Sequence, residues 1–347
     1  MINVLTIDQQ DKWDECVRAV PDYDVFYLND YLCAFHSLGA GEPLLITYSN
    51  GSSYAVNAVF KRDISEDKHF NGKIESNKYF DIITPYGYGW FIGTVNDKTK
   101  LMQEWQNFCH DNGFISEFVR FNLFTDYKDY YPGVVETNTH NVIRTLQVPL
   151  ESIWTDFKPK VRKNVKRANA NGLQIVLDND GSRLDDFLRI YYGTMERTKA
   201  NDEFFFPKSF FKTLIHMQDN MMFFHVMYEE KVISTELVIY GAENCYSYLG
   251  GTDSEYFELR PNDFLKYEII KWAKEKGLQN FVLGGGYGTD DGIFQYKASF
   301  APHGIKEYYI GKSIFNENSY LKLCDIRKIE YCDDVLTTGY FPRYRIV

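Results

Sequence analysis

The sequence predicts an α/β protein of the α+β type, built from two tandem domains in which helices flank a mixed, mostly antiparallel sheet. The chain has 347 residues, and domains average roughly 150 residues, so about two domains are expected. The second half alternates helical and strand periodicity in a clear order, and the first half follows the same order more loosely. Apolar residues make up 44% and charged residues 25% of the chain, which is typical of a globular protein.

The first half begins with a helix over 9–20, where Trp13 and Val17 recur at helical spacing. Segments of high β-propensity follow, and then a second amphipathic helix carries Leu101 and Trp105 and ends at Gly113. The strands expected in this half cover 44–49, 53–61, 79–84 and 114–124.

The pattern begins again after residue 150. A helix over 154–171 carries Val161 and Val165 on one stripe and ends at Gly172. Further helices are expected at 184–199, 207–217 and 263–276, and strands at 172–177, 221–229, 232–240, 245–250 and 280–283. Asn262 or Asp263 is the expected N-cap of the helix over 263–276. The sequence therefore predicts domains at 1–150 and 151–316, followed by a C-terminal helix and tail at 317–347.

Charge and composition limit the function classes. Thirty-eight basic against 48 acidic residues give a net charge of −10, which argues against a general nucleic-acid binder because phosphate neutralisation supplies most of that affinity. No apolar run reaches the ~20 residues of a membrane span, and the acidic N-terminus does not resemble a signal peptide. Six scattered cysteines and seven dispersed histidines without an HExxH motif indicate reduced thiols and no metal site. We expect a cytoplasmic protein without a membrane span; its oligomeric state stays open.

Several segments carry a family resemblance. LGGGYGTDDGIFQYKASFAPHG (283–304) has a glycine run, an aromatic–Lys pair and a further Phe; VRKNVKRANANGLQI (161–175) is a basic helix that ends in Gly; and TPYGYGW (84–90) is a Tyr–Gly loop. With RFN (120–122) and FPRYR (341–345), they resemble the FemABX family of peptidoglycan-bridge aminoacyltransferases and their GNAT-like acyltransferase relatives. Trp90 stands where the family loop has its last glycine. The resemblance implies two GNAT-like domains, in agreement with the doubling of the pattern.

Lys297 is the first candidate catalytic residue, and Tyr296 is the aromatic residue of the same pair. The resemblance implies that Lys297 lies at the acyl-donor end of the site and stabilises the oxyanion that forms when an amine attacks a carbonyl. The alternative is a solvated surface lysine.

Glu236 is the second candidate catalytic residue. Strand alternation places it on one face with Ser234 and Val238, and a carboxylate among apolar residues is costly unless it is paired or used. GNAT-like enzymes often carry a general base on a central strand, so Glu236 is a candidate for deprotonating the attacking ammonium. The alternative is a structural ion pair with Arg or Lys.

A basic helix is the clearest signal that does not depend on the resemblance. Six of the ten residues over 158–167 are basic and none is acidic: Lys158, Lys160, Arg162, Lys163, Lys166 and Arg167. This pattern suits the phosphates of a nucleotide-linked or lipid-linked anionic acceptor, or the acceptor end of a charged tRNA. The alternative is an ordinary solvated helix face.

Two further groups complete the predicted site. Gly285 and Gly286 allow a substrate phosphate to approach the backbone closely, although helix–strand packing explains them equally well. Tyr86, Tyr88 and Arg120 are expected to line an acceptor groove, or else to serve as core and turn residues.

The sequence predicts an acyl or aminoacyl transferase that forms an amide on an amine of a cell-envelope precursor, such as a peptidoglycan or nucleotide-sugar intermediate. No tightly bound cofactor is expected. The donor is aminoacyl-tRNA or acyl-CoA, and the segment before the helix over 263–276 lacks the glycines with which GNAT enzymes bind the pyrophosphate of CoA. Two alternatives stay open. One is an acyl-CoA-dependent N-acyltransferase of an amino sugar in polysaccharide synthesis, and the other is a non-catalytic binding module for an anionic glycan or nucleotide-sugar.

Overall fold

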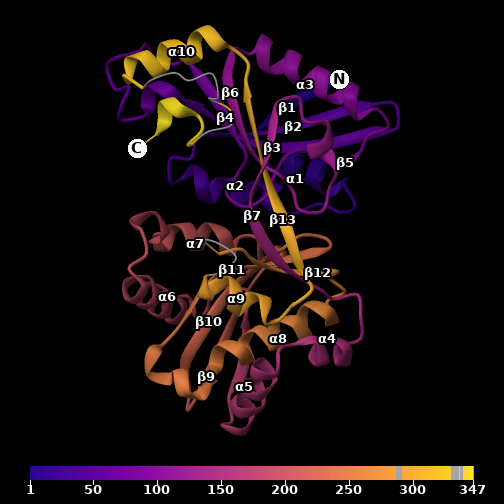
Figure 1. Ribbon diagram of the computed structural model, residues 1–347, viewed down its shortest axis with the longest axis vertical. Coiled ribbons are helices and arrows are strands. Elements are labelled where there is room, and N and C mark those ends of the chain that lie inside the picture. The colour runs from indigo at the N-terminus through magenta and orange to yellow at the C-terminus, as the bar shows by residue number, and fades with distance from the viewer. Residues whose placement is uncertain (287–290, 330–335, 337–338, 347) are drawn as a thin grey trace. The chain divides into compact units, whose positions relative to one another are not determined.

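The computed structural model describes residues 1–286, 291–329, 336 and 339–346 and divides into two compact units (Figure 1). Unit 1 comprises Met1–Asn138 and Tyr308–Val347, and unit 2 comprises Thr139–Glu307. The boundary near residue 150 and the assignment of 308–316 to the second domain are therefore corrected. The reason is that β7 (Val134–Thr145) and β13 (Ile305–Ile314) each carry the chain from one unit to the other.

Unit 1 is a sheet with the strand order β1-β2-β3-β4-β6-β13, and β5 pairs with β3 at one side. Its strands are β1 (Ile2–Thr6), β2 (Glu42–Asn50), β3 (Ser53–Asp63), β4 (Phe80–Ile83), β5 (Ile92–Thr94) and β6 (Phe114–Arg120). Its helices are α1 (Gln10–Arg18), α2 (Asn29–His36), α3 (Lys98–Asp111) and α10 (Glu317–Ile326). The predicted C-terminal helix is thus present and packs in unit 1.

Unit 2 has the strand order β7-β12-β11-β10-β9-β8. Its strands are β8 (Gln174–Asp178), β9 (Met221–Tyr228), β10 (Lys231–Tyr240), β11 (Asn244–Thr252) and β12 (Asn280–Gly284). Its helices are α4 (Leu150–Asp156), α5 (Pro159–Ala170), α6 (Leu184–Thr198), α7 (Lys208–Ile215), α8 (Pro261–Glu275) and α9 (Gly292–Ala298). The single helix predicted over 154–171 is two helices, because Pro159 cannot continue α4 and begins α5.

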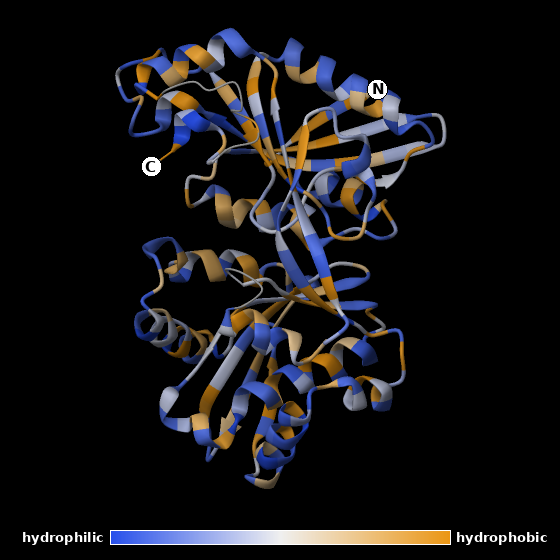
Figure 2. Ribbon diagram, viewed as in Figure 1, coloured by the Kyte–Doolittle hydropathy of each residue, from blue (hydrophilic) through white to orange (hydrophobic). Residues whose placement is uncertain are grey.

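The sheet of each unit contains one parallel strand pair, which supports the prediction of two similar domains. In unit 1, β4 pairs parallel with β6, and in unit 2, β11 pairs parallel with β12, while the other registered pairs are antiparallel. In each unit, hydrophobic residues line the strands and the helix faces that pack on them (Figure 2). The predicted fold class, a mixed and mostly antiparallel sheet flanked by helices, is therefore confirmed.

In the loop that contains Tyr86 and Tyr88, Trp90 has a backbone conformation that glycine adopts more easily than other residues. Trp90 has a φ of +81°, in the left-handed region that favours glycine. Its indole is fully buried and makes edge contacts with Trp105 and Tyr131. Aromatic packing of this kind offsets the backbone strain.

No helix in the described part of the chain is long and apolar enough to cross a membrane. The cysteines that the structure describes are free thiols, namely Cys16, Cys33, Cys109, Cys245 and Cys324. Cys332 lies outside the described residues.

Candidate active site

Lys297 lies in the last turn of α9, the short helix that follows the glycine run. Asp291 caps this helix by accepting a hydrogen bond from the backbone N–H of Phe294 at 2.8 Å. The Lys297 ammonium donates to the carbonyl oxygen of Gly285 at 2.6 Å. Lys297 is therefore largely buried and held by the backbone beyond β12, in contrast to a solvated surface lysine.

Electrostatics favour partial loss of the Lys297 proton. Burial, together with the nearby charge of Lys266, lowers the pKa of Lys297 to about 8, while the charges of Glu236 and Asp291 oppose the shift. A lysine in this environment titrates near neutral pH, which is common for groups in active sites.

The glycine run is explained by close packing. A Cβ at Gly285 would lie 2.6 Å from the carbonyl oxygen of His140, and a Cβ at Gly286 would lie 2.1 Å from a carboxylate oxygen of Asp291. Side chains at these positions would collide with β7 and with the cap of α9. These contacts favour the packing explanation for both glycines, and substrate binding by them stays a prediction.

Glu236 lies in the middle of β10 and is paired with Lys266 of α8. The ammonium of Lys266 donates to both carboxylate oxygens, at 2.6 and 2.5 Å, and to Ser247 Oγ at 2.6 Å. Glu236 is 4% and Lys266 7% exposed. The geometry favours the structural ion pair over the general base, because both oxygens of the carboxylate accept from one cation. The base assignment stays a prediction.

Lys266 is a member of the site that the sequence did not single out. It lies on α8 beside the buried residues Leu265 and Ile269. A lysine next to an apolar stripe usually extends to solvent. The sequence did contain a signal for this pair: a carboxylate lies in an apolar strand, and a cation lies on an apolar helix face. Each of these charges is costly to bury unless it is paired.

Tyr296 and Asp263 lie close to this pair. The Tyr296 hydroxyl is buried with no hydrogen-bond partner among the described residues, and its ring packs edge-on against Phe300 at 5.3 Å. Burial raises the pKa of Tyr296 well above its usual value, and the charges of Asp263 and Glu236 add to the shift. Asp263 accepts from Asn164 Nδ2 at 3.2 Å. The structure thus brings Lys297, Tyr296 and Glu236 together in unit 2, as one polar cluster with Lys266, Ser247 and Asp263.

The start of α8 differs from the prediction. The N-cap is Arg260, with a φ of +62°, and Pro261 is the first helical residue, so Asn262 and Asp263 are not the cap. Asp263 instead lies buried in the first turn, where burial raises its pKa. A proline removes one N–H donor, and a carboxylate in the first turn repels phosphate. These residues do not form the N-terminal phosphate cradle that CoA binding of the usual GNAT kind requires.

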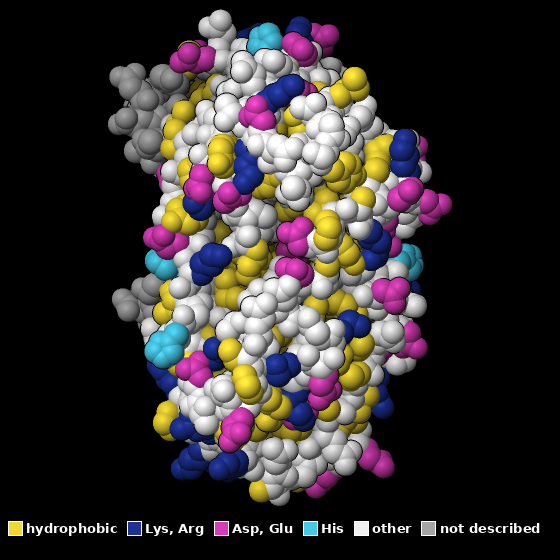
Figure 3. Space-filling model, turned by 90° about the vertical axis from the view of Figure 1, so that its right-hand side faces the viewer, with side chains coloured by type: hydrophobic (Ala, Val, Ile, Leu, Met, Phe, Trp, Pro, Cys, Tyr) yellow, Lys and Arg dark blue, Asp and Glu magenta, His cyan; other side chains and the backbone are white. Residues whose placement is uncertain are grey.

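The basic residues of α5 separate into two groups. The guanidinium of Arg162 donates to the carbonyl oxygens of Thr155 and Phe157, and Arg167 lies 3.5 Å from Glu258. Lys158, Lys160, Lys163 and Lys166 are exposed. Figure 3 shows Lys and Arg interspersed with Asp and Glu on one face of the molecule. Arg162 therefore has a structural role at the end of α4, and the four exposed lysines are the better candidates for phosphate contacts.

Tyr86, Tyr88 and Arg120 lie together in unit 1. Tyr86 is 45% exposed and its ring lies 5.8 Å from that of Phe35. Tyr88 makes edge contacts with Phe26 and Tyr308 at 5.5 and 5.4 Å. Arg120 donates to the Thr84 carbonyl at 3.3 Å. The loop and the end of β6 thus present aromatic and cationic groups in one region of the unit; the acceptor groove and binding there stay predictions.

The described residues contain no group of three or more His, Cys, Asp or Glu side chains placed to hold a metal ion.

Comparison with known proteins gives consistent results. Residues 156–298 match the profile of the acetyltransferase (GNAT) domain family. The UDP-N-acetylmuramoylpentapeptide-lysine N(6)-alanyltransferase of Weissella viridescens is 25% identical over 182 residues, which are 51% of this chain and 53% of the relative. The chain thus matches about half the length of this curated relative.

Solved structures share the fold of the chain. A crystal structure of FemX superposes with a TM-score of 0.67 at 13% identity, over 93% of this chain and 99% of that one. The C-terminal domain of a putative lysylphosphatidylglycerol synthetase from Agrobacterium fabrum superposes with a TM-score of 0.54 at 10% identity, over 96% and 99%. The predicted resemblance is borne out to this extent: residues 156–298 match the GNAT domain family, part of the chain is similar to a Fem-type alanyltransferase, and the chain shares the fold of FemX.

Proposed function

We propose that the protein is an aminoacyltransferase that forms an amide on an amine of a peptidoglycan precursor. The observation that carries the proposal is the partly buried ammonium of Lys297, which is held by the Gly285 carbonyl beside the Glu236–Lys266 pair. The alanyltransferase activity in the name of the Weissella viridescens relative supports the reaction class and the acceptor. Such precursors are nucleotide-linked or lipid-linked, and we place the reaction in the cytoplasm.

In the proposed mechanism the acceptor amine attacks the acyl carbonyl, and the carbonyl oxygen becomes negatively charged. Lys297 donates a hydrogen bond to that oxyanion, because its ammonium has N–H groups beyond the one that faces Gly285. The intermediate collapses with departure of the donor's alcohol or thiol, which receives a proton. The attacking ammonium must first lose its own proton, and Glu236 can accept it only if its bond to Lys266 loosens.

We favour aminoacyl-tRNA as the donor. Asp263 and Pro261 make the start of α8 a poor site for the pyrophosphate of acyl-CoA. Exposed Lys158, just before α5, and Lys160, Lys163 and Lys166 on α5 suit a phosphate backbone. An acyl-CoA-dependent N-acyltransferase of an amino sugar is the alternative enzyme, and binding of acetyl-CoA in place of aminoacyl-tRNA would favour it.

One observation favours the non-catalytic alternative. Glu236 is engaged by Lys266, as expected if the cluster were structural in a module that binds an anionic glycan or nucleotide-sugar. Turnover of any donor–acceptor pair by the purified protein decides between a transferase and a module of this kind.

The deciding variant is Lys297→Met, which keeps the length of the side chain and removes its charge. We expect transfer from alanyl-tRNA to UDP-N-acetylmuramoylpentapeptide to fall by roughly 100-fold or more, the scale of losing an oxyanion donor, with an unchanged unfolding temperature. Lys276→Met, at the end of α8 in the same unit, is the matched control. Near-normal turnover in Lys297→Met would refute the assignment.

The pH dependence tests the protonation state that the mechanism needs. Because the pKa of Lys297 is about 8, the ammonium is present below pH 8 and is lost above it. Activity through oxyanion stabilisation should therefore decline as the pH rises through 8, whereas activity through Lys297 as a base should increase. The residual activity of Lys297→Met should show neither change.

A further inference from the structure

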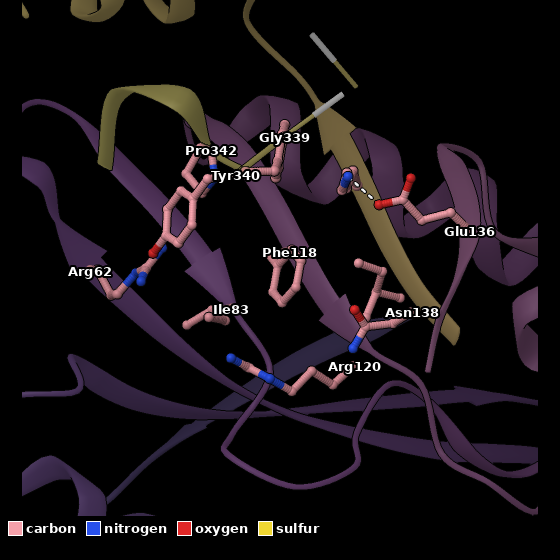
Figure 4. Close-up of a pocket in the computed structure, with 12 residues that line it drawn as sticks. Arg62, Ile83, Phe118, Arg120, Glu136, Asn138, Gly339, Tyr340 and Pro342 are labelled. Carbon is pink, nitrogen blue, oxygen red and sulfur yellow. Dashed lines mark ion pairs between the residues drawn. The ribbon is translucent and has the colours of Figure 1, made fainter. Parts of the chain in front are cut away.

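A pocket of about 280 Å³ lies on one face of the unit 1 sheet (Figure 4). Three basic side chains, Arg62, Arg120 and Lys312, line it, with Glu136 as the only carboxylate among its lining residues. Apolar groups complete the walls, among them Phe118 and the C-terminal segment at 339–342. The pocket thus combines basic and apolar lining groups, in a chain whose net charge is −10.

Strand register explains why these distant residues meet. Phe118 of β6 is opposite Lys312 of β13 and beside Ile83 of β4, and Arg120 is opposite Ile310. Side chains two residues apart on a strand share a face, and directly paired residues share it too. Arg62 of β3, opposite Asp81, therefore faces the same side.

The charges in the pocket are incompletely paired. Asp81 accepts from Arg62 Nε at 2.7 Å and also from Arg345 Nε at 2.6 Å, and Arg345 has a second carboxylate, Asp67, at 3.4 Å; Arg62 therefore shares its only ion-pair partner among the described residues. Burial opposes ionisation of Asp81, but the two arginines outweigh it and lower its pKa. The Nη2 atom of Arg62 is buried and has no hydrogen-bond partner among the described residues. A buried donor without a hydrogen-bond partner costs free energy, and a ligand that accepts a hydrogen bond from it would remove that cost.

The other two cations differ from each other. Lys312 is buried and paired with Glu136, as the dashed line in Figure 4 marks. Arg120 forms no ion pair within the part of the chain that the structure describes; its guanidinium donates to the Thr84 carbonyl and packs over the ring of Phe118 at 5.1 Å. Figure 4 shows the hydroxyl end of Tyr340 directed toward Arg62. Arg62 and Arg120 are therefore the groups available to an incoming ligand.

We infer that this pocket binds an oxyanion, a phosphate or carboxylate group, that is attached to an organic body packed against Phe118 and Phe341. Guanidinium groups match both oxyanions through paired hydrogen bonds. The volume suits part of a ligand, such as one sugar phosphate or one terminal amino acid, more than a whole precursor. That the ligand is part of the acceptor rests on the proposed function; the binding chemistry does not.

The test is titration calorimetry without any donor, using UDP, uridine and the dipeptide alanyl-alanine as probes. Binding of UDP but not uridine identifies phosphate as the recognised group, and binding of the dipeptide identifies carboxylate. Arg120→Gln should weaken the bound probe by at least tenfold, while Arg18→Gln, a matched change on α1 of the same unit, should leave it within twofold. Tyr340→Ala, at a position 51% exposed, should weaken it less, with no effect on folding.

Failure of both oxyanion probes to bind the unaltered protein at millimolar concentration would overturn the inference. Binding that Arg120→Gln and Tyr340→Ala leave unchanged would also overturn it. Neither result depends on catalysis. A Lys297→Met variant that retains full turnover would refute the proposed mechanism and leave this binding result untouched.

Discussion

Each unit buries a glutamate in the middle of a strand, and the two glutamates are stabilised in different ways. In unit 2, Glu236 accepts both hydrogen bonds from the ammonium of Lys266. In the described part of unit 1, Glu117 of β6 accepts from two neutral donors, Trp105 Nε1 at 3.2 Å and the Tyr131 hydroxyl at 3.1 Å. Burial raises the pKa of Glu117 to about 8. The two glutamates therefore show two ways of burying a carboxyl: Glu236 is paired with a cation, and Glu117 retains a proton more readily.

The different surroundings of the two glutamates lead to different expectations for activity. The charged pair of unit 2 lies close enough to Lys297 to influence its proton affinity, whereas the neutral arrangement of unit 1 is enclosed by the aromatic rings of Trp105 and Tyr131. We expect substitutions at Glu236 or Lys266 to change both folding and activity. Substitutions at Glu117 should change folding alone.

The largest expected effect comes from breaking the charged pair. Lys266→Met leaves Glu236 buried without a cation and should destabilise unit 2 by about 3–5 kcal/mol. The double variant Lys266→Met with Glu236→Leu should recover most of that loss, since removing both charges costs little. Urea unfolding of the two single variants, the double variant and the unaltered protein completes the cycle. A loss below about 1 kcal/mol in Lys266→Met would contradict the burial of the pair.

The second prediction concerns the neutral carboxyl of unit 1. The folded pKa of Glu117, about 8, lies above its ordinary value of 4.5, so the folded state binds the proton more tightly. Its stabilising contribution is complete below about pH 4.5 and is lost as the pH rises through 8, with a slope of roughly 1.4 kcal/mol per pH unit between these limits.

Glu117→Gln supplies a neutral side chain at every pH and should remove that slope. Relative to the unaltered protein, the variant should gain roughly 2 kcal/mol in free energy of unfolding between pH 6 and 8. Glu104→Gln, on α3 in the same unit, is the control and should leave the slope in place. If Glu117→Gln and the unaltered protein show parallel pH profiles, Glu117 ionises within the folded unit and the contrast with Glu236 is lost.

Some features of the two units could be predicted from the sequence, and others could not. Local patterns predicted most of the helices and strands, and the glycine run with Tyr296-Lys297 indicated the part of unit 2 where Lys297, Tyr296 and Glu236 lie close together. Strand β7 was missed because its sequence, VVETNTHNVIRT, is too polar for a clear alternation, and its path between the units moved the boundary from 150 to 138. Lys266 and the unit 1 pocket were missed because both depend on long-range pairing: Arg62 and Tyr340 are 278 positions apart in the chain, and no local periodicity records their proximity.

The smallest expected effect separates the exposed charges of the two units. If the donor is a tRNA that contacts α5, replacing Lys163 and Lys166 together with Gln should weaken its binding several-fold and reduce the slope of log affinity against log salt by about 1 to 2. The control carries the same charge change in unit 1, Lys68→Gln with Lys73→Gln, two exposed positions, and should alter neither quantity. Filter binding across a salt series measures both. Equal losses in the two double variants would mean that tRNA responds to the net charge of the chain and not to the basic helix, and the assignment of donor binding to unit 2 would fail.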